Sequence, residues 1–570
     1  MFTEYPRPQL KRQSFFSLNG EWLLQGQKIT VPYPPQSTLA NYTGEISCMM
    51  DYQKTFTLSQ DFVSEIEKGK HVLLHFGAVD QIAQVVLDGH FLGTHEGGYL
   101  PFSFDITESL STDINHTLTV RVIDTLSTLY PYGKQCEKSH GMWYTQVSGI
   151  WQTVWLETVN KEHISSLKML PQVQKEKQSL EISFTTENIT DFSEYSAEIE
   201  IPSPAGKIIS KKIQLSSKAH FDFESELGFE NWTCENPKLY DFSVKLFRGK
   251  NEIDQVESYF ALRSITIENE NCIPYFALNG QKIFLNAVLD QGYYPQGIFL
   301  GESEQDFLTD ILNMKNLGFN TLRKHIKVEP ECFYYYCDKY GMLVMQDMVQ
   351  SGKYNFWRDT AFPSLFNKKG NENQIGKEGS TQPQSSLRKD FFVNHSLETI
   401  AHLYNHPCII YWTIFNEGWG QFSTNELYTL VKNSDSSRIV DSASGWFFGA
   451  KSDVQSEHIY FKAKKLDKIL ANCKKQNLPL VVSECGGFKL NIPGHTSASG
   501  VSYGYGECKT QSELTAKIRD MHAKMIEPYK DKGLCGFVYT QISDVENEIN
   551  GLYTYDRKVK KVDCDKLTFL

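Results

Sequence analysis

The sequence lacks the features that mark membrane, secreted and zinc-binding proteins. No apolar run approaches the ~20 residues that a membrane span needs, and the opening MFTEYPRPQLKRQSFF contains no stretch of signal-peptide length. Neither a CxxC pair nor an HExxH motif occurs, so no structural zinc site or zincin site is expected. These absences predict no membrane partner, no metal and no other cofactor.

Paired cysteines and excess positive charge are also missing. The 12 cysteines are scattered without paired spacing, and some of them, such as Cys408 and Cys535, interrupt apolar runs. Buried reduced thiols fit this pattern, so we expect a cytoplasmic protein. The net charge of −11 argues against a nucleic-acid partner, because phosphate binding needs clustered Lys and Arg.

What the sequence does contain is length and aromatic side chains. A chain of 570 residues is too long for one hydrophobic core, and two to four domains are expected. Aromatic residues make up 13% of the chain, including 29 Tyr and 9 Trp. Their faces could stack on sugar rings, but β-rich cores also need them, and cores are the more frequent use.

The pattern divides the chain into three domains. Residues 1–160 contain short β-rich runs such as HVLLHFGAV and TLTVRVID with Asn-Gly and Asp-Gly turns, and predict a jelly-roll β-sandwich. Residues 161–264 alternate apolar and polar residues over about the length of an immunoglobulin-like β-sandwich. In residues 265–570, apolar strands alternate with helical stretches, which indicates a parallel sheet.

Eight strands are expected in the third domain, which is the count of a (β/α)8 TIM barrel. They are KIFLNAVL, FNTLRKH, MLVMQDM, CIIYWTIFN, SRIVDSA, DVQSEHIY, PLVVSE and CGFVYTQ. Helices are expected in EQDFLTDILNMKNLG and SELTAKIRDMHAKMIEPY, and residues 351–386 should form a long loop after strand three.

Polar residues gather where these strands end, the edge at which barrel active sites lie. The ring consists of Asp290, Arg323, His325, Asp347, Asn416, Glu417, His458, Tyr460, Glu484, Tyr539 and Gln541. Such carboxylates, hydroxyls and amides could bind a carbohydrate or glycoside substrate. The two histidines, taken alone, are more often structural residues than catalysts.

Two carboxylates of this ring each end a buried apolar strand: Glu417 after IIYWTIFN and Glu484 after LPLVVS. A carboxylate in that place is costly to desolvate unless a partner or a function compensates. Glycoside hydrolysis needs such a pair, one as acid and one as nucleophile. A structural ion pair is the alternative for Glu484, and an Asn-Glu dipeptide alone carries little information. Strands four and seven face each other across a barrel, and this joint placement favours catalysis.

An ordered series of motifs then resembles glycoside hydrolase family 2, the β-galactosidase and β-glucuronidase group. It covers essentially the whole chain and includes LNGEW, HEGGYLPFSFDIT, SGIWQTVWLE, LRKHIKVEP, HPCIIYWTIFNEGWGQF and VVSECGGF. The resemblance implies a retaining exo-β-glycosidase that acts by double displacement, most similar to a β-galactosidase.

The resemblance also implies roles for residues. Glu417 would be the acid/base and Glu484 the nucleophile, while Asn416 would hold the sugar 2-hydroxyl and Tyr460 would hydrogen-bond the nucleophile. Further substrate contacts would come from His325, Asp290 and His458, with Trp446 and Tyr539 as walls of the −1 subsite. Relatives in the family are often oligomers, so a homo-oligomer is a further possibility.

The chain departs from the family pattern in two places. Cys485 follows the nucleophile where relatives often carry an aromatic residue, a change that should affect packing. The Asn-x-Lys element with which β-glucuronidases hold the sugar carboxylate is absent from NEINGLYTYDR. β-Glucuronidase activity, or another sugar or aglycone, is therefore the alternative, with Arg323, Lys324, Lys327 or the loop near Lys368 binding the carboxylate. A catalytically dead carbohydrate-binding protein is a more remote one.

Overall fold

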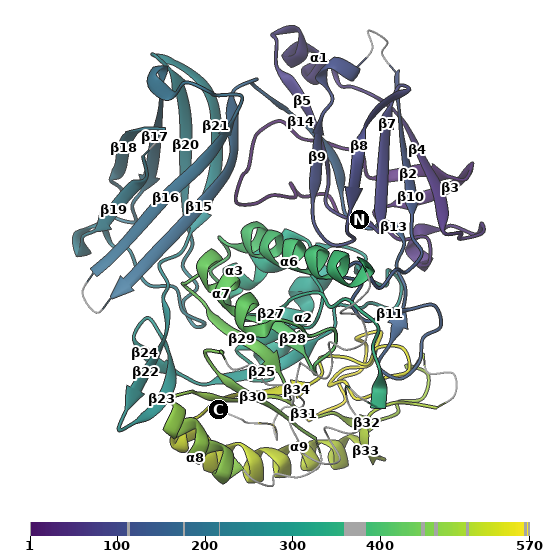
Figure 1. Cartoon of the computed structure of the whole chain (residues 1–570), viewed down its shortest axis with the longest axis vertical. Coiled ribbons are helices and arrows are strands. Elements are labelled where there is room, and N and C mark those ends of the chain that lie inside the picture. Colours follow the sequence, from purple (N-terminus) through teal and green to yellow (C-terminus); the bar gives the residue numbers. More distant parts are fainter. Residues whose placement is uncertain are drawn as a thin grey trace.

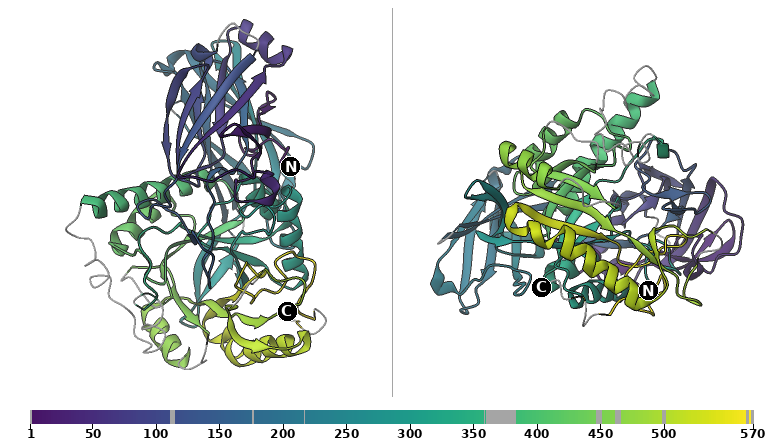
Figure 2. Two further views of the ribbon diagram at one scale, coloured as in Figure 1. Left: turned by 90° about the vertical axis from the view of Figure 1, so that its right-hand side faces the viewer. Right: turned by 90° about the horizontal axis from the view of Figure 1, so that it is seen from below.

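The computed structural model describes residues 2–110, 115–174, 177–215, 217–357, 359, 383–445, 451–460, 466–497, 501–563 and 567. Two β-sandwiches lie side by side on one side of a barrel domain (Figure 1). A view turned by 90° shows both sandwiches above the barrel, and a view from below shows them on opposite flanks of it (Figure 2). None of the described helices is long and apolar enough to cross a bilayer.

The first sandwich packs a six-stranded antiparallel sheet against a four-stranded one, as the jelly-roll prediction requires. In β2 (Gly20–Leu24) and β10 (Asn115–Ile123), buried residues alternate with more exposed ones, because successive side chains point to opposite faces. The six-stranded sheet has the order β3 (Gln27–Val31), β2 (Gly20–Leu24), β4 (Met49–Thr57), β10 (Asn115–Ile123), β7 (Ile82–Leu87) and β8 (His90–Glu96). The four-stranded sheet has the order β1 (Phe16–Ser17), β14 (Val154–Val159), β5 (His71–Phe76) and β9 (Phe102–Asp105).

The second sandwich has seven described strands around a core of its own, the number of an immunoglobulin constant-type domain. One sheet contains β15 (His163–Gln174), β16 (Lys177–Glu187) and β19 (Ala219–Phe223). The other contains β18 (Ile208–Gln214), β17 (Tyr195–Pro202), β20 (Tyr240–Arg248) and β21 (Asn251–Phe260). The domain boundaries at residues 160 and 264 stay predictions.

All eight predicted barrel strands are present in one parallel sheet. In chain order they are β25 (Leu285–Asp290), β26 (Thr321–Lys324), β27 (Leu343–Asp347), β28 (Ile409–Asn416), β29 (Ile439–Ser444), β30 (Gln455–Ile459), β31 (Leu480–Gly486) and β34 (Leu534–Thr540). The sheet order β29-β28-β27-β26-β25-β34-β31-β30 places the fourth and seventh strands on different sides of the barrel.

The connections of the barrel are less regular than the sequence predicts. The two expected helices are present as α2 (Glu304–Asn316) and α9 (Gln511–Met525), together with α3 (Glu331–Tyr340), α6 (Pro383–Leu403), α7 (Thr424–Ser434) and α8 (Leu466–Gln476). No described residue between β29 and β30 is helical. Helix α6 begins inside the predicted loop 351–386, most of which lies outside the described residues.

One predicted strand is divided in two. KIFLNAVL forms β24 (Gln281–Ile283) and then β25, and β24 belongs to a small antiparallel sheet with β22 (Ile265–Glu270) and β23 (Ile273–Leu278). Side chains from this sheet, including Phe276 and Leu278, share a hydrophobic cluster with barrel residues. An apolar strand pattern alone does not tell which sheet the strand joins, and this one serves both.

Candidate active site

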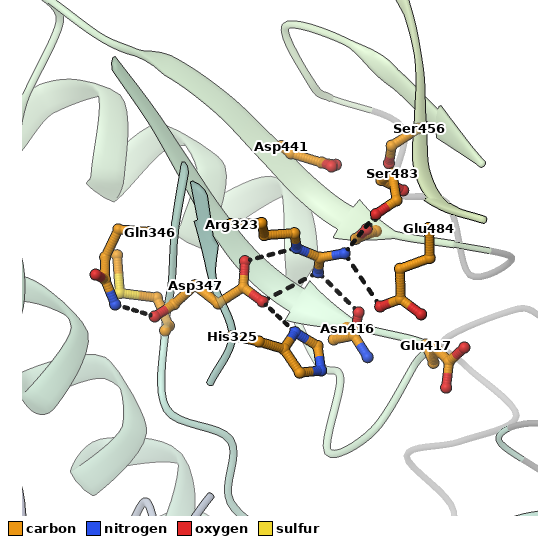
Figure 3. A network of polar contacts seen from close by, with 12 residues as sticks. Arg323, His325, Gln346, Asp347, Asn416, Glu417, Asp441, Ser456, Ser483 and Glu484 are labelled. Atoms are coloured by element: carbon orange, nitrogen blue, oxygen red, sulfur yellow. Dashed lines mark hydrogen bonds and ion pairs between the residues drawn. The ribbon is translucent and has the colours of Figure 1, made fainter. Parts of the chain in front are cut away.

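Glu417 and Glu484 meet at the carboxyl ends of the barrel strands (Figure 3). Glu417 directly follows β28 and Glu484 lies in β31, and both are buried, at 8% and 6% exposure. An oxygen of each carboxyl group lies within 4.8 Å of one of the other. The structure therefore brings together the two carboxyl groups at the ends of the fourth and seventh strands, as the sequence predicts.

A β-bulge aims Glu484 into the barrel mouth. Against β34, Val482 pairs with Phe537 and Cys485 with Tyr539, so two residues of β31 oppose one of its neighbour. The extra residue lets both Ser483 and Glu484 face inward, because a bulge interrupts the alternation of the strand. Cys485, next along the strand, is fully buried in the core, in agreement with the expectation that it affects packing.

Arg323 on β26 is the centre of the polar network in Figure 3, a role that sequence reasoning missed. Its guanidinium is fully buried and forms an ion pair with Asp347 at 3.0 Å. It also donates to Glu484 Oε1 at 3.1 Å, to the Ser483 carbonyl at 3.0 Å and to Asn416 Oδ1 at 2.9 Å. One side chain thus fixes residues from three other strands, as the planar fork of arginine allows.

These contacts keep Glu484 ionised. Burial alone would raise the pKa of its carboxyl group, but the nearby His458 and Arg323 outweigh burial and lower that pKa to about 2. Tyr460, just after β30, donates its hydroxyl to Glu484 Oε2 at 2.5 Å, as the resemblance predicts. Glu484 is therefore a charged carboxylate with a donor on each oxygen.

The backbone of Glu417 and the side-chain amide of Asn416 are also held in place. Glu417 has a φ of +53°, which non-glycine residues seldom adopt, and its N–H donates to the Ser444 carbonyl at 2.9 Å. Because arginine can only donate, the Asn416 atom that faces Arg323 must be Oδ1. The Asn416 NH₂ group is thereby turned away from Arg323 and can donate to a ligand.

His458 on β30 lies between the two carboxyl groups. Its Nδ1 is 2.9 Å from Glu417 Oε1 and 3.5 Å from Glu484 Oε2, and its Nε2 is 3.0 Å from Ser444 Oγ. Glu417, His458 and Glu484 could in principle hold a divalent ion. Arg323 opposes this, because its positive charge is already hydrogen-bonded to one of the three ligands.

His325, directly after β26, faces the same region. Its Nδ1 is 2.8 Å from Asp347 Oδ2, while its buried Nε2 has no hydrogen-bond partner among the described residues. Burial, aided by nearby positive charges, holds the pKa of His325 well below its usual value, so the ring is neutral. With Nδ1–H donating to Asp347, Nε2 is left as an acceptor for a ligand hydroxyl.

Three cations proposed as carboxylate binders are already paired. Arg323 is committed to Asp347 and Glu484 as described, and Lys324 Nζ lies 2.5 Å from Asp290 and 2.7 Å from Glu329. Lys327 pairs with Glu329 at 2.8 Å. One carboxylate oxygen of Asp290 thus pairs with Lys324, and its other oxygen accepts a hydrogen bond from the Gly292 N–H. Lys368 lies outside the described residues.

One of the two predicted aromatic walls, Tyr539, lies elsewhere than predicted. Tyr539 is 1% exposed and its ring packs against the backbone of Gly486, so it does not join the carboxylates. The strand-end residue of β34 that does reach the site is Thr540, whose Oγ1 is 3.2 Å from the Tyr460 hydroxyl. The physical reason is strand alternation, which turns neighbouring side chains to opposite faces. Trp446 lies outside the described residues.

Comparison with known proteins gives the family. Residues 275–562 match the pattern described as "Glycosyl hydrolases family 2, TIM barrel domain". The chain belongs to glycosyl hydrolase family 2. Two further family 2 patterns match the sandwiches: the galactose-binding domain-like pattern over residues 23–151 and the general family 2 pattern over residues 162–263.

Relatives of this family 2 chain carry two kinds of name. A putative β-glucuronidase of Formosa agariphila is 26% identical over 62% of this chain and 39% of its own length. A β-galactosidase of Thermoanaerobacter pseudethanolicus is 26% identical over 64% of this chain and 44% of its own length. The chain thus spans less than half the length of these two relatives.

Solved structures agree in fold. A β-glucuronidase of Lactobacillus rhamnosus superposes with a TM-score of 0.77 at 16% identity, covering 99% of this chain and 98% of that one. A β-glucuronidase of Dictyoglomus thermophilum gives 0.76 at 17% identity, with 99% of each chain covered. At such identity the likeness concerns the three-domain fold alone.

Proposed function

We propose that this family 2 chain is a retaining exo-β-glycosidase in which Glu484 is the nucleophile and Glu417 the acid/base. The observation that carries the proposal is the separation of at most 4.8 Å between oxygens of the two carboxyl groups. Retaining enzymes hold their carboxyl groups about 5–5.5 Å apart, whereas inverting enzymes leave about 6.5–9.5 Å for a water molecule.

In the first step, a Glu484 oxygen attacks the anomeric carbon as the bond to the departing oxygen breaks. Glu417 gives its proton to that oxygen, and the aglycone leaves as an alcohol. The 2.9 Å contact between Glu417 and His458 holds the Glu417 carboxyl group in place. The product of the step is a covalent glycosyl ester on Glu484.

In the second step, Glu417 removes a proton from water, and the oxygen of that water displaces Glu484 from the anomeric carbon. The sugar is released with its original configuration. The NH₂ group of Asn416, which is turned away from Arg323, would donate to the sugar 2-hydroxyl, and His325 Nε2 would accept from another hydroxyl. Tyr460 would disperse charge on the departing carboxylate through its 2.5 Å hydrogen bond.

The test uses Glu484→Ala and Glu417→Gln on a panel of aryl glycosides of galactose, glucuronic acid, glucose, mannose, xylose and arabinose. Each variant should lose about 10⁴-fold or more of kcat, because one variant lacks the proposed nucleophile and the other lacks the proposed general acid. Azide should rescue Glu484→Ala and give a glycosyl azide of inverted configuration.

Glu426→Gln is the matched control, because Glu426 also follows an asparagine but is exposed on α7. It should keep wild-type activity. Equal activity in wild type, Glu484→Ala and Glu417→Gln would refute the assignment. Failure of the wild type on every glycoside would favour the non-catalytic carbohydrate-binding alternative.

The names of the relatives divide between β-galactosidase and β-glucuronidase, so the sugar has to be inferred from the site. A β-galactoside is the expectation from the sequence. A β-uronide is the second candidate, and the positive charge of Lys134 favours it. The cytoplasmic location and the homo-oligomeric state stay predictions.

A further inference from the structure

A loop of the first sandwich, Leu126–Val147, lies on the barrel mouth, and we call it the mouth loop. Within it, β11 (Gln135–Cys136) lies beside the barrel in Figure 1. The N–H groups of Tyr132 and Gly133 donate to the Gln350 carbonyl at 3.0 and 3.2 Å. The Tyr144 hydroxyl donates to the buried carboxylate of Glu548, in the loop after β34. The mouth loop is thus bonded to the loops that follow the third and eighth barrel strands.

Lys134 occupies a fixed place in the mouth loop. Before it, Gly133 has a φ of +71°, and a Cβ there would lie 3.1 Å from the carbonyl oxygen of Ile326, the residue after His325. After it, the buried Gln135 donates to Asp80 at 2.8 Å. The Lys134 carbonyl accepts the Tyr144 N–H at 3.0 Å. The backbone of Lys134 is therefore held at the end of β26.

The charge of Lys134 reaches three groups of the barrel mouth. Burial has the largest influence on three pKa values here: it lowers that of His325 and raises those of Glu484 and Glu548. The positive charge of Lys134 lowers all three pKa values. These groups follow β26, lie in β31 and follow β34, respectively. The charge of Lys134 thus acts on groups at three strand ends, and the close approach of Gly133 to Ile326 places the backbone of Lys134 at one of them.

Lys134 differs from the other cations at these strand ends. Arg323, Lys324 and Lys327 are buried in ion pairs with carboxylates. Lys134 is half-buried, and its ammonium forms neither an ion pair nor a hydrogen bond within the described part of the chain. A partly desolvated ammonium that forms no direct ion pair with a described carboxylate favours a ligand that brings a negative charge.

We propose that the first sandwich contributes a substrate-binding residue: Lys134 binds the carboxylate of a uronic acid bound in the −1 subsite. This inference rests on the proposed glycosidase function. Lys134 would replace the Asn-x-Lys element that NEINGLYTYDR lacks, from a different domain and a different loop. Specificity for the sugar would then depend on the packing of the mouth loop on the barrel.

The experiment compares substrates that differ only at C6. They are the 4-nitrophenyl β-glycosides of glucuronic acid and glucose, and those of galacturonic acid and galactose. The wild type should have the higher kcat/KM on the uronide of at least one pair. Lys134→Met should lower that kcat/KM about 100-fold, which corresponds to about 2.7 kcal/mol. The loss should lie mainly in KM, because the ion pair exists in both the ground state and the transition state.

Two further variants make the test specific. Lys134→Arg should keep most of the uronide activity, since arginine has the same positive charge as lysine. If Lys134 had only a structural role, activity would not depend on that charge. Lys138→Met is the matched control, because Lys138 is an exposed lysine of the same loop, and it should change neither activity. On the neutral glycosides, Lys134→Met should lower kcat/KM by much less than on the uronides.

The inference fails if the wild type prefers the neutral member of both pairs, or if Lys134→Met lowers uronide and neutral activities equally. Either result leaves the proposed function intact as long as Glu484→Ala is inactive on the preferred sugar. Activity of Glu484→Ala at the wild-type level would instead refute the proposed function itself.

Discussion

Replacement of Arg323 by lysine separates the charge of this residue from its geometry. Lysine keeps one positive charge but loses the planar fork. The native guanidinium reaches Asp347, Glu484 and Asn416 at 2.9 to 3.1 Å. A single ammonium on a flexible stem can satisfy Asp347 or Glu484, but it cannot also hold the Asn416 amide in one orientation.

The expected loss follows from the bonds that disappear. Hydrogen bonds to charged groups contribute about 1.5–3 kcal/mol each, so the loss of two costs about 3–6 kcal/mol. At about 1.4 kcal/mol per tenfold, kcat/KM should fall by about 10²–10⁴-fold. The assay is initial-rate hydrolysis of the best aryl glycoside, with a thermal melt to show that the variant is folded.

Arg121→Lys is the control, because Arg121 is exposed on β10 and bonds Asp51 through Nε at 2.8 Å and Nη2 at 3.0 Å. This variant should keep full activity, since exposed ion pairs contribute at most about 1 kcal/mol. A folded Arg323→Lys with the kcat/KM of the wild type would refute the reasoning, because it would show that the fork is not needed to orient the site.

Two other predictions concern Glu484. Tyr460→Phe removes a donor to the ionised carboxylate, so the pKa of Glu484 should rise and the acidic limb of the kcat/KM profile should move to higher pH; an unchanged limb would contradict this. The pKa of Glu484 is lowered to about 2 in the folded protein, from an ordinary value of 4.5, so its contribution to stability is present above about pH 4.5 and is lost as the pH falls through about 2. Urea titrations should therefore show that the wild type loses more stability than Glu484→Gln between pH 5 and pH 2; parallel losses would count against the low pKa.

The sequence predicts the barrel and the pair of carboxyl groups at its mouth because both follow from local patterns. Strands such as β28 and β31 are apolar runs that lead into Glu417 and Glu484, so hydrophobicity and spacing predict that these two carboxyl groups lie at strand ends, where the structure has them. The alternation of side chains along a strand also explains why the prediction for Tyr539 is wrong. Neighbouring residues face opposite sides, so the residue of β34 that faces the site is Thr540, one position later.

Other features depend on contacts between distant segments, which no local pattern records. The bulge at Ser483 is visible only from its neighbours β30 and β34. Arg323 stands out in the sequence only as a charged residue in an apolar strand, and its partners lie 24 to 161 positions away. Lys134 comes from another domain, and only the packing of the mouth loop brings its charge to the site.

The acidic residues of the loop after β34 depend on distant contacts in the same way. Asp544, Glu546 and Glu548 lie close together in the sequence, but their spacing does not tell which partners they have. In the structure, Asp544 is buried and lies 2.6 Å from Lys561, and Glu546 accepts the Thr145 N–H at 3.1 Å. Glu548 binds Tyr144. Glu546 and Glu548 thus form hydrogen bonds with the mouth loop.

The most direct test of double displacement is the configuration of the first sugar released. Proton NMR of the anomeric signal, recorded within the first minutes of hydrolysis of an aryl β-glycoside, distinguishes the two anomers before mutarotation mixes them. A pair of carboxyl groups within 4.8 Å predicts that the β-anomer appears first. Initial release of the α-anomer would contradict the account.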